Sequence, residues 1–111
     1  MSFNVIATLP FERKLKKLAK KHKSIRDDLL SVIDLLEQNP TMGTSLGKNC
    51  FKIRFVLSGK AKGKRGGARI ITFVRSLKNT VYLVDIYDKS EQNSISDREL
   101  KNLIELISDN E

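Results

Sequence analysis

The chain has 111 residues, of which 40% are hydrophobic and 31% charged, and its formal net charge is +8. This length and balance suit one domain with its own core, so we expect a single domain over residues 1–111. The charge predicts attraction to a polyanion, and no apolar run approaches the roughly 20 residues of a membrane-spanning helix or the pattern of a secretion signal, which favours a cytoplasmic protein without a membrane partner.

The positive charge is concentrated in two windows of the chain. Residues 13–26 and residues 48–69 hold eight Lys and Arg each, 16 of the 21 in the chain, and neither window contains an acidic residue. Acidic residues concentrate at 27–37 and after Asp85. We therefore expect one basic surface and one surface of mixed charge.

The first half of the chain predicts a short strand followed by two helices. Residues 4–8 are apolar and β-branched, which is typical of a strand. In residues 11–22, apolar side chains recur at helical spacing and the lysines between them form a solvated face. A second helix begins at Ser24, which fits a capping box with Asp27, and it stops at Asn39. The short turn between the helices predicts an antiparallel helical hairpin.

The second half predicts a loop, three strands and a helix. Residues 41–49 contain two glycines and read as a loop. Three strands follow, at residues 51–57, 68–75 and 80–88. The short turn between the last two predicts antiparallel pairing. A C-terminal helix begins at about Asp97, where Ser96 and Glu99 fit a second capping box.

This order of elements predicts an α+β fold with a small, mostly antiparallel sheet. We expect the helices on one face of the sheet and the other face open. In the first strand of the hairpin, three apolar side chains alternate toward the helices: Phe51, Ile53 and Phe55. In the last strand we expect three side chains in the core: Tyr82, Val84 and Ile86. Three others then lie on the open face: Leu83, Asp85 and Tyr87.

The open face gathers basic and phenolic side chains. We expect five of them to contact the reacting part of a bound polyanion: Lys52, Arg54, Arg69, Tyr87 and Lys89. The glycine-rich loop beside them adds four cations that we expect to bind RNA: Lys60, Lys62, Lys64 and Arg65. This loop is not a nucleotide-binding P-loop, because it lacks the G-K-[ST] ending and no helix follows it.

Cations and a tyrosine can cleave RNA without a metal, because RNA carries its own nucleophile, the 2′-hydroxyl. Arginine forks match the oxygens of a phosphate. A lysine among like charges gives up its proton more easily and can act as base or acid. Tyr87 can orient the phosphate, donate a proton or stack on a base. Residue types alone leave plain nucleic-acid binding open, and favour it over cleavage.

Other reactive residue types are scarce in this sequence. His22 stands alone on the lysine-rich helix, so we expect a surface residue rather than a catalyst. Cys50, at the start of a strand, is typical of a small apolar filler, and a single cysteine allows no intramolecular disulfide. Because no metal-binding motif occurs either, we expect no metal site and no small-molecule cofactor.

Three segments together resemble one known family of proteins. They are Lys52-Ile53-Arg54, the loop from Gly63 to Ile71 (GKRGGARII), and the run from Tyr82 to Glu91 (YLVDIYDKSE). This combination is similar to the RelE/ParE superfamily of bacterial toxins, and most similar to its RelE and HigB-like branch. The resemblance covers nearly the whole chain, including the helical hairpin and the C-terminal helix.

The resemblance implies a sheet like that of microbial ribonucleases and an mRNA interferase that cuts translated mRNA in the ribosomal A site. It implies two partners, the ribosome with its mRNA and a cognate antitoxin. By position, Lys52 and Arg54 match the family's basic pair, and Arg69 matches the arginine that stabilises the transition state. Tyr87 and Lys89 lie where the family keeps a tyrosine or a basic residue.

This sequence departs from the family pattern in two ways. No histidine lies near the matched positions, and the C-terminal helix lacks the tyrosine that some RelE members use, so Tyr87 would have to replace it. The alternative hypothesis is a non-catalytic member, either a ParE-like gyrase poison or a basic translation inhibitor that binds nucleic acid without cutting it.

Overall fold

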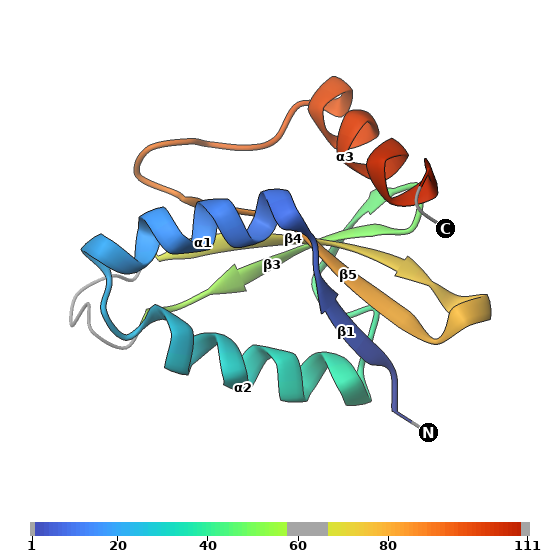
Figure 1. Ribbon diagram of the computed structural model, residues 1–111, viewed down its shortest axis with the longest axis horizontal. Helices are drawn as coiled ribbons and strands as arrows, with labels where there is room; N and C mark the ends of the chain where they lie inside the picture. Colours follow the sequence, from blue (N-terminus) through green and yellow to red (C-terminus); the bar gives the residue numbers. More distant parts are fainter. Residues whose placement is uncertain (1, 58–66, 110–111) are drawn as a thin grey trace.

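A computed structural model describes residues 2–57 and 67–109 of the chain and contains one five-stranded sheet with three helices (Figure 1). In chain order the elements are β1 (Asn4–Ala7), α1 (Leu9–Lys21), α2 (Ile25–Gln38), β2 (Thr44–Gly47), β3 (Cys50–Phe55), β4 (Ala68–Arg75), a 3₁₀ turn (Ser76–Lys78), β5 (Thr80–Asp88) and α3 (Asp97–Asp109). The strands lie in the order β1-β5-β4-β3-β2. Within residues 2–57 and 67–109 only β1 pairs in parallel, with β5, which confirms the predicted α+β fold and its mostly antiparallel sheet.

The helical hairpin forms as predicted, and its apolar stripes cover one face of the sheet. In α1, Phe11, Leu15 and Leu18 are buried at helical spacing. The helix starts two residues earlier than predicted, because Pro10 lies in its first turn, where a missing N–H costs no hydrogen bond. The stripe of α2 runs from Ile25 to Leu36 and joins the same core.

The two predicted capping boxes have different outcomes. Ser24 precedes α2, but its side chain makes no capping bond, and its hydroxyl donates instead to the Asp28 carboxylate at 3.0 Å. The prediction of a box with Asp27 is therefore wrong. At α3 the Ser96 hydroxyl oxygen accepts a hydrogen bond from the Glu99 N–H at 3.1 Å, which confirms the first half of that box.

The prediction that all helices share one face of the sheet is wrong. Whereas α1 and α2 pack against the face that carries Ile53 and Phe55, α3 packs on the opposite face through Leu100 and Ile107. Figure 1 shows α2 and α3 on opposite sides of the sheet. An amphipathic stripe predicts that a helix packs, but the stripe does not choose between the two faces. Only part of the predicted open face therefore remains uncovered.

Residues 41–49, predicted as a loop, contain the edge strand β2. It pairs antiparallel with β3, so that Thr44 lies opposite Lys52. The connection to β3 uses two successive left-handed residues, Lys48 at φ 54° and Asn49 at φ 65°, as a tight hairpin turn requires. The strand brings a hydroxyl side chain next to the predicted basic pair.

A β-bulge in β5 corrects the predicted parity of that strand. Ile71 lies opposite Asp85 while Thr72 lies opposite Leu83, so Val84 is an extra residue. All nine residues of β5 are buried, with Leu83 and Ile86 in the core beneath α1 and α2. Tyr82, Val84 and Tyr87 belong to the cluster beneath α3. Tyr82 and Val84 are thus not in the predicted core, and Leu83 is not on the predicted face.

Gly43 and Gly47 provide a matched test of how tightly β2 packs on β3. A Cβ at Gly43 (φ +102°) would lie 2.5 Å from the Lys52 backbone oxygen, whereas a Cβ at Gly47 (φ +85°) would meet no atom within 4 Å. We expect Gly47→Ala to cost about 1–2 kcal/mol, from the left-handed backbone alone. Gly43→Ala should cost more, because the strand must also move. Urea unfolding of both variants measures the difference, and equal losses would contradict this account of β2.

Candidate functional site

Three side chains form a row across the exposed end of the α3 face. Arg54 on β3 lies opposite Arg69 on β4, and Arg69 lies opposite Tyr87 on β5. Neighbours in such a row are about 5 Å apart at Cβ. Arg54 is exposed, while Arg69 is only 8% and Tyr87 only 4% exposed. The row therefore holds two guanidinium groups and a phenol on rigid strands rather than on loops.

A polar cavity of about 290 Å³ lies over this end of the sheet. Five residues line it: Thr44, Lys52, Arg54, Arg69 and Lys89. Four of the five predicted catalytic residues thus surround one space, together with a hydroxyl that the sequence analysis missed. Among the described residues, the lining carries four cations and no carboxylate, which is the composition of an anion site. Such close cations repel one another, and a bound phosphate would relieve that repulsion.

Lys89 reaches the cavity because hydrogen bonds fix the turn that follows β5. Its N–H donates to the Gly67 carbonyl at 3.1 Å, next to the start of β4. Gly67 has φ +73°, and a Cβ there would lie 2.6 Å from the Phe55 carbonyl oxygen, so the close approach needs glycine. The Asp88 carboxylate accepts from the Ser90 N–H at 2.9 Å and from its hydroxyl at 2.7 Å, which fixes the turn around Lys89.

His22 is not the surface residue that its sequence context predicts. Its side chain is mostly buried, and Nε2 lies 3.2 Å from the second carboxylate oxygen of Asp88. Next to it, Lys21 forms an ion pair with Glu91. The end of α1 thus anchors the turn that carries Lys89. His22 has a structural role near the cavity but does not line it.

Tyr87 combines burial with an unsatisfied hydroxyl. Burial raises the pKa of Tyr87, and the opposing effect of the Arg69 charge is smaller. Within the described residues its hydroxyl has no hydrogen-bond partner. An unpaired buried hydroxyl costs about 1–3 kcal/mol. The phenol is therefore protonated at neutral pH and lacks an acceptor, although Tyr87 itself lines a neighbouring cavity, beside Lys14 and Lys17, rather than the cationic one.

An ion pair that the sequence analysis missed ties three elements together. Asp85, 1% exposed on β5, lies 2.7 Å from Nζ of Lys14 on α1, and that ammonium lies 3.8 Å from Glu99 on α3. A carboxylate inside an otherwise apolar strand was the available signal, because a buried charge needs a partner. The sequence does not identify Lys14 as that partner, since many lysines lie on the same helix.

The other predicted residues have varied outcomes. The four loop cations, Lys60, Lys62, Lys64 and Arg65, lie outside the described residues. Cys50 is fully buried, as an apolar filler should be, and burial raises the pKa of its thiol to about 11. In residues 2–57 and 67–109, no three His, Cys, Asp or Glu gather as a metal site would require. Nor is any helix there long and apolar enough to cross a membrane.

Comparison with known proteins identifies the family. A family model described as the RelE toxin of the RelE / RelB toxin-antitoxin system matches residues 11–110. Among solved structures, the E. coli toxin RelE, as an arginine-to-alanine mutant in the free state, is similar with a TM-score of 0.62 and 17% identity, covering 96% of this chain and 99% of that one. That identity supports the fold alone, whereas the family model spans most of the chain. The chain belongs to the RelE toxin family of toxin–antitoxin systems.

Proposed function

We propose that this protein is a ribosome-dependent endoribonuclease that cuts translated mRNA by attack of the 2′-hydroxyl on the adjacent phosphorus. The observation that carries the proposal is the cationic cavity, where four of the five expected catalytic side chains surround one polar space. Membership of a toxin family supplies the biological context. The positive charge of the whole chain favours approach to ribosomal RNA.

The cavity suits the charge that develops during cleavage. As the 2′-oxygen bonds to phosphorus, negative charge accumulates on the nonbridging phosphate oxygens. The guanidinium groups of Arg54 and Arg69 can each donate two hydrogen bonds to those oxygens. Because Arg69 is held on a central strand and nearly buried, it is oriented before substrate binds, and such preorganised donors contribute most to transition-state stabilisation.

Cleavage also requires two proton transfers. One proton leaves the 2′-hydroxyl, and Lys52 and Lys89 are the cavity residues whose side chains can exchange it. Another proton must reach the departing 5′-oxygen. Tyr87, the neighbour of Arg69 in the row, is our candidate for this second role, although it lines the adjacent cavity. Its raised pKa keeps the phenol protonated, and its hydroxyl has no acceptor among the described residues. The products are a 2′,3′-cyclic phosphate and a free 5′-hydroxyl.

Mapping of 3′ ends tests the proposed function. Purified protein is added to a cell-free translation reaction, with a parallel reaction that contains the same mRNA without ribosomes. We expect cuts in register with codons, and only in the translated sample. Cuts on free RNA would indicate an independent ribonuclease. Stalled translation without any cut, or DNA cleavage in cells, would move the protein to the non-catalytic alternatives.

Arginine substitutions test the cavity directly. Arg69→Ala should lower the rate of mRNA cleavage by about 10²–10³-fold, since it removes a preorganised donor. Arg54→Ala should also lower the rate, with little effect on stability, because that side chain is exposed. Arg75→Ala, at the other end of the same strand as Arg69, is the matched control and should retain the wild-type rate. Equal activity of all three variants would exclude the cavity as the active site.

Tyr87→Phe separates activity from stability. Removing a hydroxyl that has no partner among the described residues should leave the free energy of unfolding at pH 7 unchanged or raised. Cleavage should fall by about 10²-fold or more if the phenol is the general acid. Tyr82→Phe, on the same strand and face but away from the row, should cleave normally. Normal cleavage by Tyr87→Phe would remove Tyr87 from the mechanism.

The same variant tests the raised pKa of Tyr87. The unfolded chain releases the phenolic proton near pH 10, at a lower pH than the folded chain does. The raised pKa of Tyr87 therefore adds to the free energy of unfolding below about pH 10, and this contribution is lost as pH rises toward the pKa of the folded state. Urea unfolding should show that wild type loses stability relative to Tyr87→Phe only above about pH 10. A parallel pH dependence of the two proteins would contradict the shift.

A further inference from the structure

The turn that carries Lys89 into the cationic cavity consists of polar residues only. Residues 89–94 read KSEQNS, most of them are exposed, and neither apolar cluster of the described residues includes them. We propose that His22, at the end of α1, is a positioning residue of the proposed ribonuclease, because its contact with Asp88 sets the place of Lys89 in the cavity. The inference rests on the proposed function and adds a residue that acts from outside the cavity.

The Asp88 carboxylate joins the turn to the helix. One of its oxygens accepts hydrogen bonds from the N–H and the hydroxyl of Ser90, at 2.9 and 2.7 Å. The other oxygen lies 3.2 Å from Nε2 of His22, which is 66 residues away in the chain. Since a carboxylate only accepts hydrogen bonds, Nε2 is the ring nitrogen that donates. Lys89 therefore lies between two residues that one carboxylate links to each other and to α1.

Burial makes this contact a stronger restraint than its neighbour. The side chains of His22 and Asp88 are only 9% and 3% exposed, so water competes little for their hydrogen bond. Lys21 and Glu91 form a second contact between the same helix end and the same turn, but both side chains are more than half exposed. Exposed ion pairs contribute little to stability. We therefore assign the positioning role to His22 and not to Lys21.

An open space, rather than packed side chains, separates the rest of the turn from α1. This cavity has a volume of about 290 Å³, and its lining includes Lys17 and Leu18 on the helix and Asp88, Glu91 and Gln92 after it in space, on the turn. A turn packed along the helix would keep its position without any single contact. Here the density of contacts is low, so the contact at the helix end has to supply the restraint.

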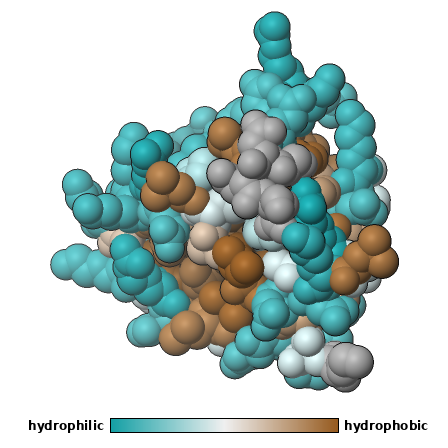
Figure 2. Space-filling model, turned by 45° about the vertical axis from the view of Figure 1, so that its right-hand side comes forward, coloured by the Kyte–Doolittle hydropathy of each residue, from teal (hydrophilic) through white to brown (hydrophobic). Residues whose placement is uncertain are grey.

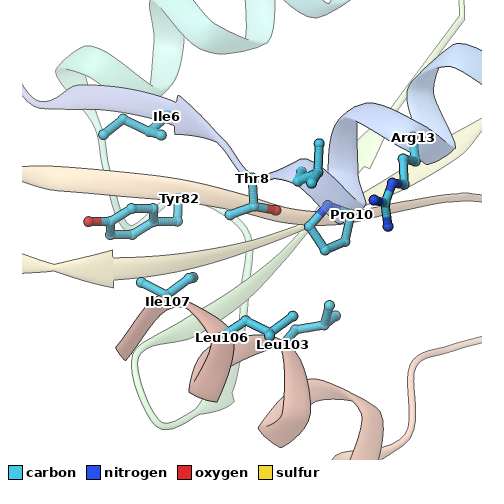
Figure 3. Close-up of a pocket in the computed structure, with 9 residues that line it drawn as sticks. Ile6, Thr8, Pro10, Arg13, Tyr82, Leu103, Leu106 and Ile107 are labelled. Atoms are coloured by element: carbon cyan, nitrogen blue, oxygen red, sulfur yellow. The ribbon is translucent and has the colours of Figure 1, made fainter. Parts of the chain in front are cut away.

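The two ends of α1 are surrounded by different kinds of side chain. At its start, a groove of about 390 Å³ is lined mostly by apolar side chains of β1, α1 and α3. Figure 3 shows Pro10 at this start, with Leu103 and Leu106 of α3 across the groove. On the surface, apolar side chains gather in one central area bordered by hydrophilic ones (Figure 2). At the end of α1 the neighbouring turn offers polar groups only, so hydrogen bonds have to hold it.

Two restraints hold Lys89 against repulsion from the other cations of the cavity. The first is its own N–H, which donates to the Gly67 carbonyl at 3.1 Å. The second is the contact of Asp88 with His22, and α1 is a firm point of attachment because its apolar stripe is buried. Without the second restraint, we expect the Lys89 ammonium to move away from Arg69, since like charges repel.

A double-mutant cycle tests whether His22 acts through Lys89. The rate of mRNA cleavage on translating ribosomes is measured for His22→Ala, Lys89→Ala and the double variant. We expect His22→Ala to lower the rate by about tenfold or more, because a small displacement of a catalytic group is costly. Once Lys89 is replaced, His22→Ala should have no further effect. A loss by the same factor in both backgrounds would indicate a merely structural role and overturn the proposal.

Two further variants provide a rescue and a control. His22→Gln keeps an N–H donor at the same number of bonds from the backbone as Nε2, so it should retain most of the wild-type rate. Lys21→Ala removes only the exposed ion pair and should cleave at the wild-type rate. Equal losses in His22→Ala and Lys21→Ala, or a wild-type rate in both, would overturn the proposal.

Amide hydrogen exchange separates this inference from the proposed function. In ¹⁵N-labelled protein without RNA, we expect His22→Ala to speed exchange at the Lys89 amide by about tenfold, and by more than at the Ile70 amide, which reports global unfolding. Faster exchange at Lys89 in a protein that does not cleave mRNA would support the restraint and overturn only the nuclease. Cleavage by wild type, with exchange at Lys89 unchanged in His22→Ala, would overturn the role of His22.

Discussion

The extra residue at Val84 is the constraint on which the arrangement of the cationic site depends. Before the bulge, odd-numbered residues of β5 such as Leu83 face α1 and α2; after it, the even-numbered Ile86 does. A regular strand would therefore bury Tyr87 beneath the helical hairpin. With the bulge, Tyr87 lies on the same face as Arg69, and Asp85 lies opposite Ile71. One irregular residue decides whether phenol and guanidinium are neighbours.

The four cations of the cavity are held in place by contacts that lie outside the cavity. Lys52, Arg54 and Arg69 extend from paired strands whose apolar neighbours, such as Ile53 and Ile70, are fixed in the core. Lys89 depends on backbone contacts to Gly67. Carboxylates are near, but they are engaged elsewhere: Asp85 with Lys14, and Asp88 with His22 and Ser90. The cations repel one another. The packed core and the ion pairs outside the cavity hold the strands in place, and so keep these like charges close together.

Local patterns predicted the elements that local chemistry determines. The boundaries of β4 and β5 follow from mostly apolar runs on either side of a short turn, and α3 begins where Ser96 provides a cap. Lys52 and Arg54 lie on one side because strand alternation places them there, and they line one cavity with Arg69 and Lys89. Tyr87 lines the neighbouring cavity instead. These features can be predicted from the local sequence because they depend little on contacts with distant segments.

The features that sequence could not predict depend on tertiary contacts. β2 has four mostly polar residues and becomes a strand only because β3 offers a partner. The residue types around Val84, between Leu83 and Asp85, do not indicate a bulge. The side of the sheet that α3 covers, and the pairing of His22 with Asp88, are decided by segments far apart in the chain. In each of these cases the local sequence suits two arrangements about equally well, and contacts with distant segments decide between them.

The parallel pairing of β1 with β5 has a consequence for biosynthesis. Asn4 is made well before its partner Thr80, because α1, α2, β2, β3 and β4 all lie between them in the chain. The antiparallel strands β3, β4 and β5 can pair with close neighbours, whereas β1 must close a long loop. The nascent chain therefore carries β1 unpaired while the elements between it and β5 are made. A partner able to cover apolar strands could meet this protein before its sheet is complete.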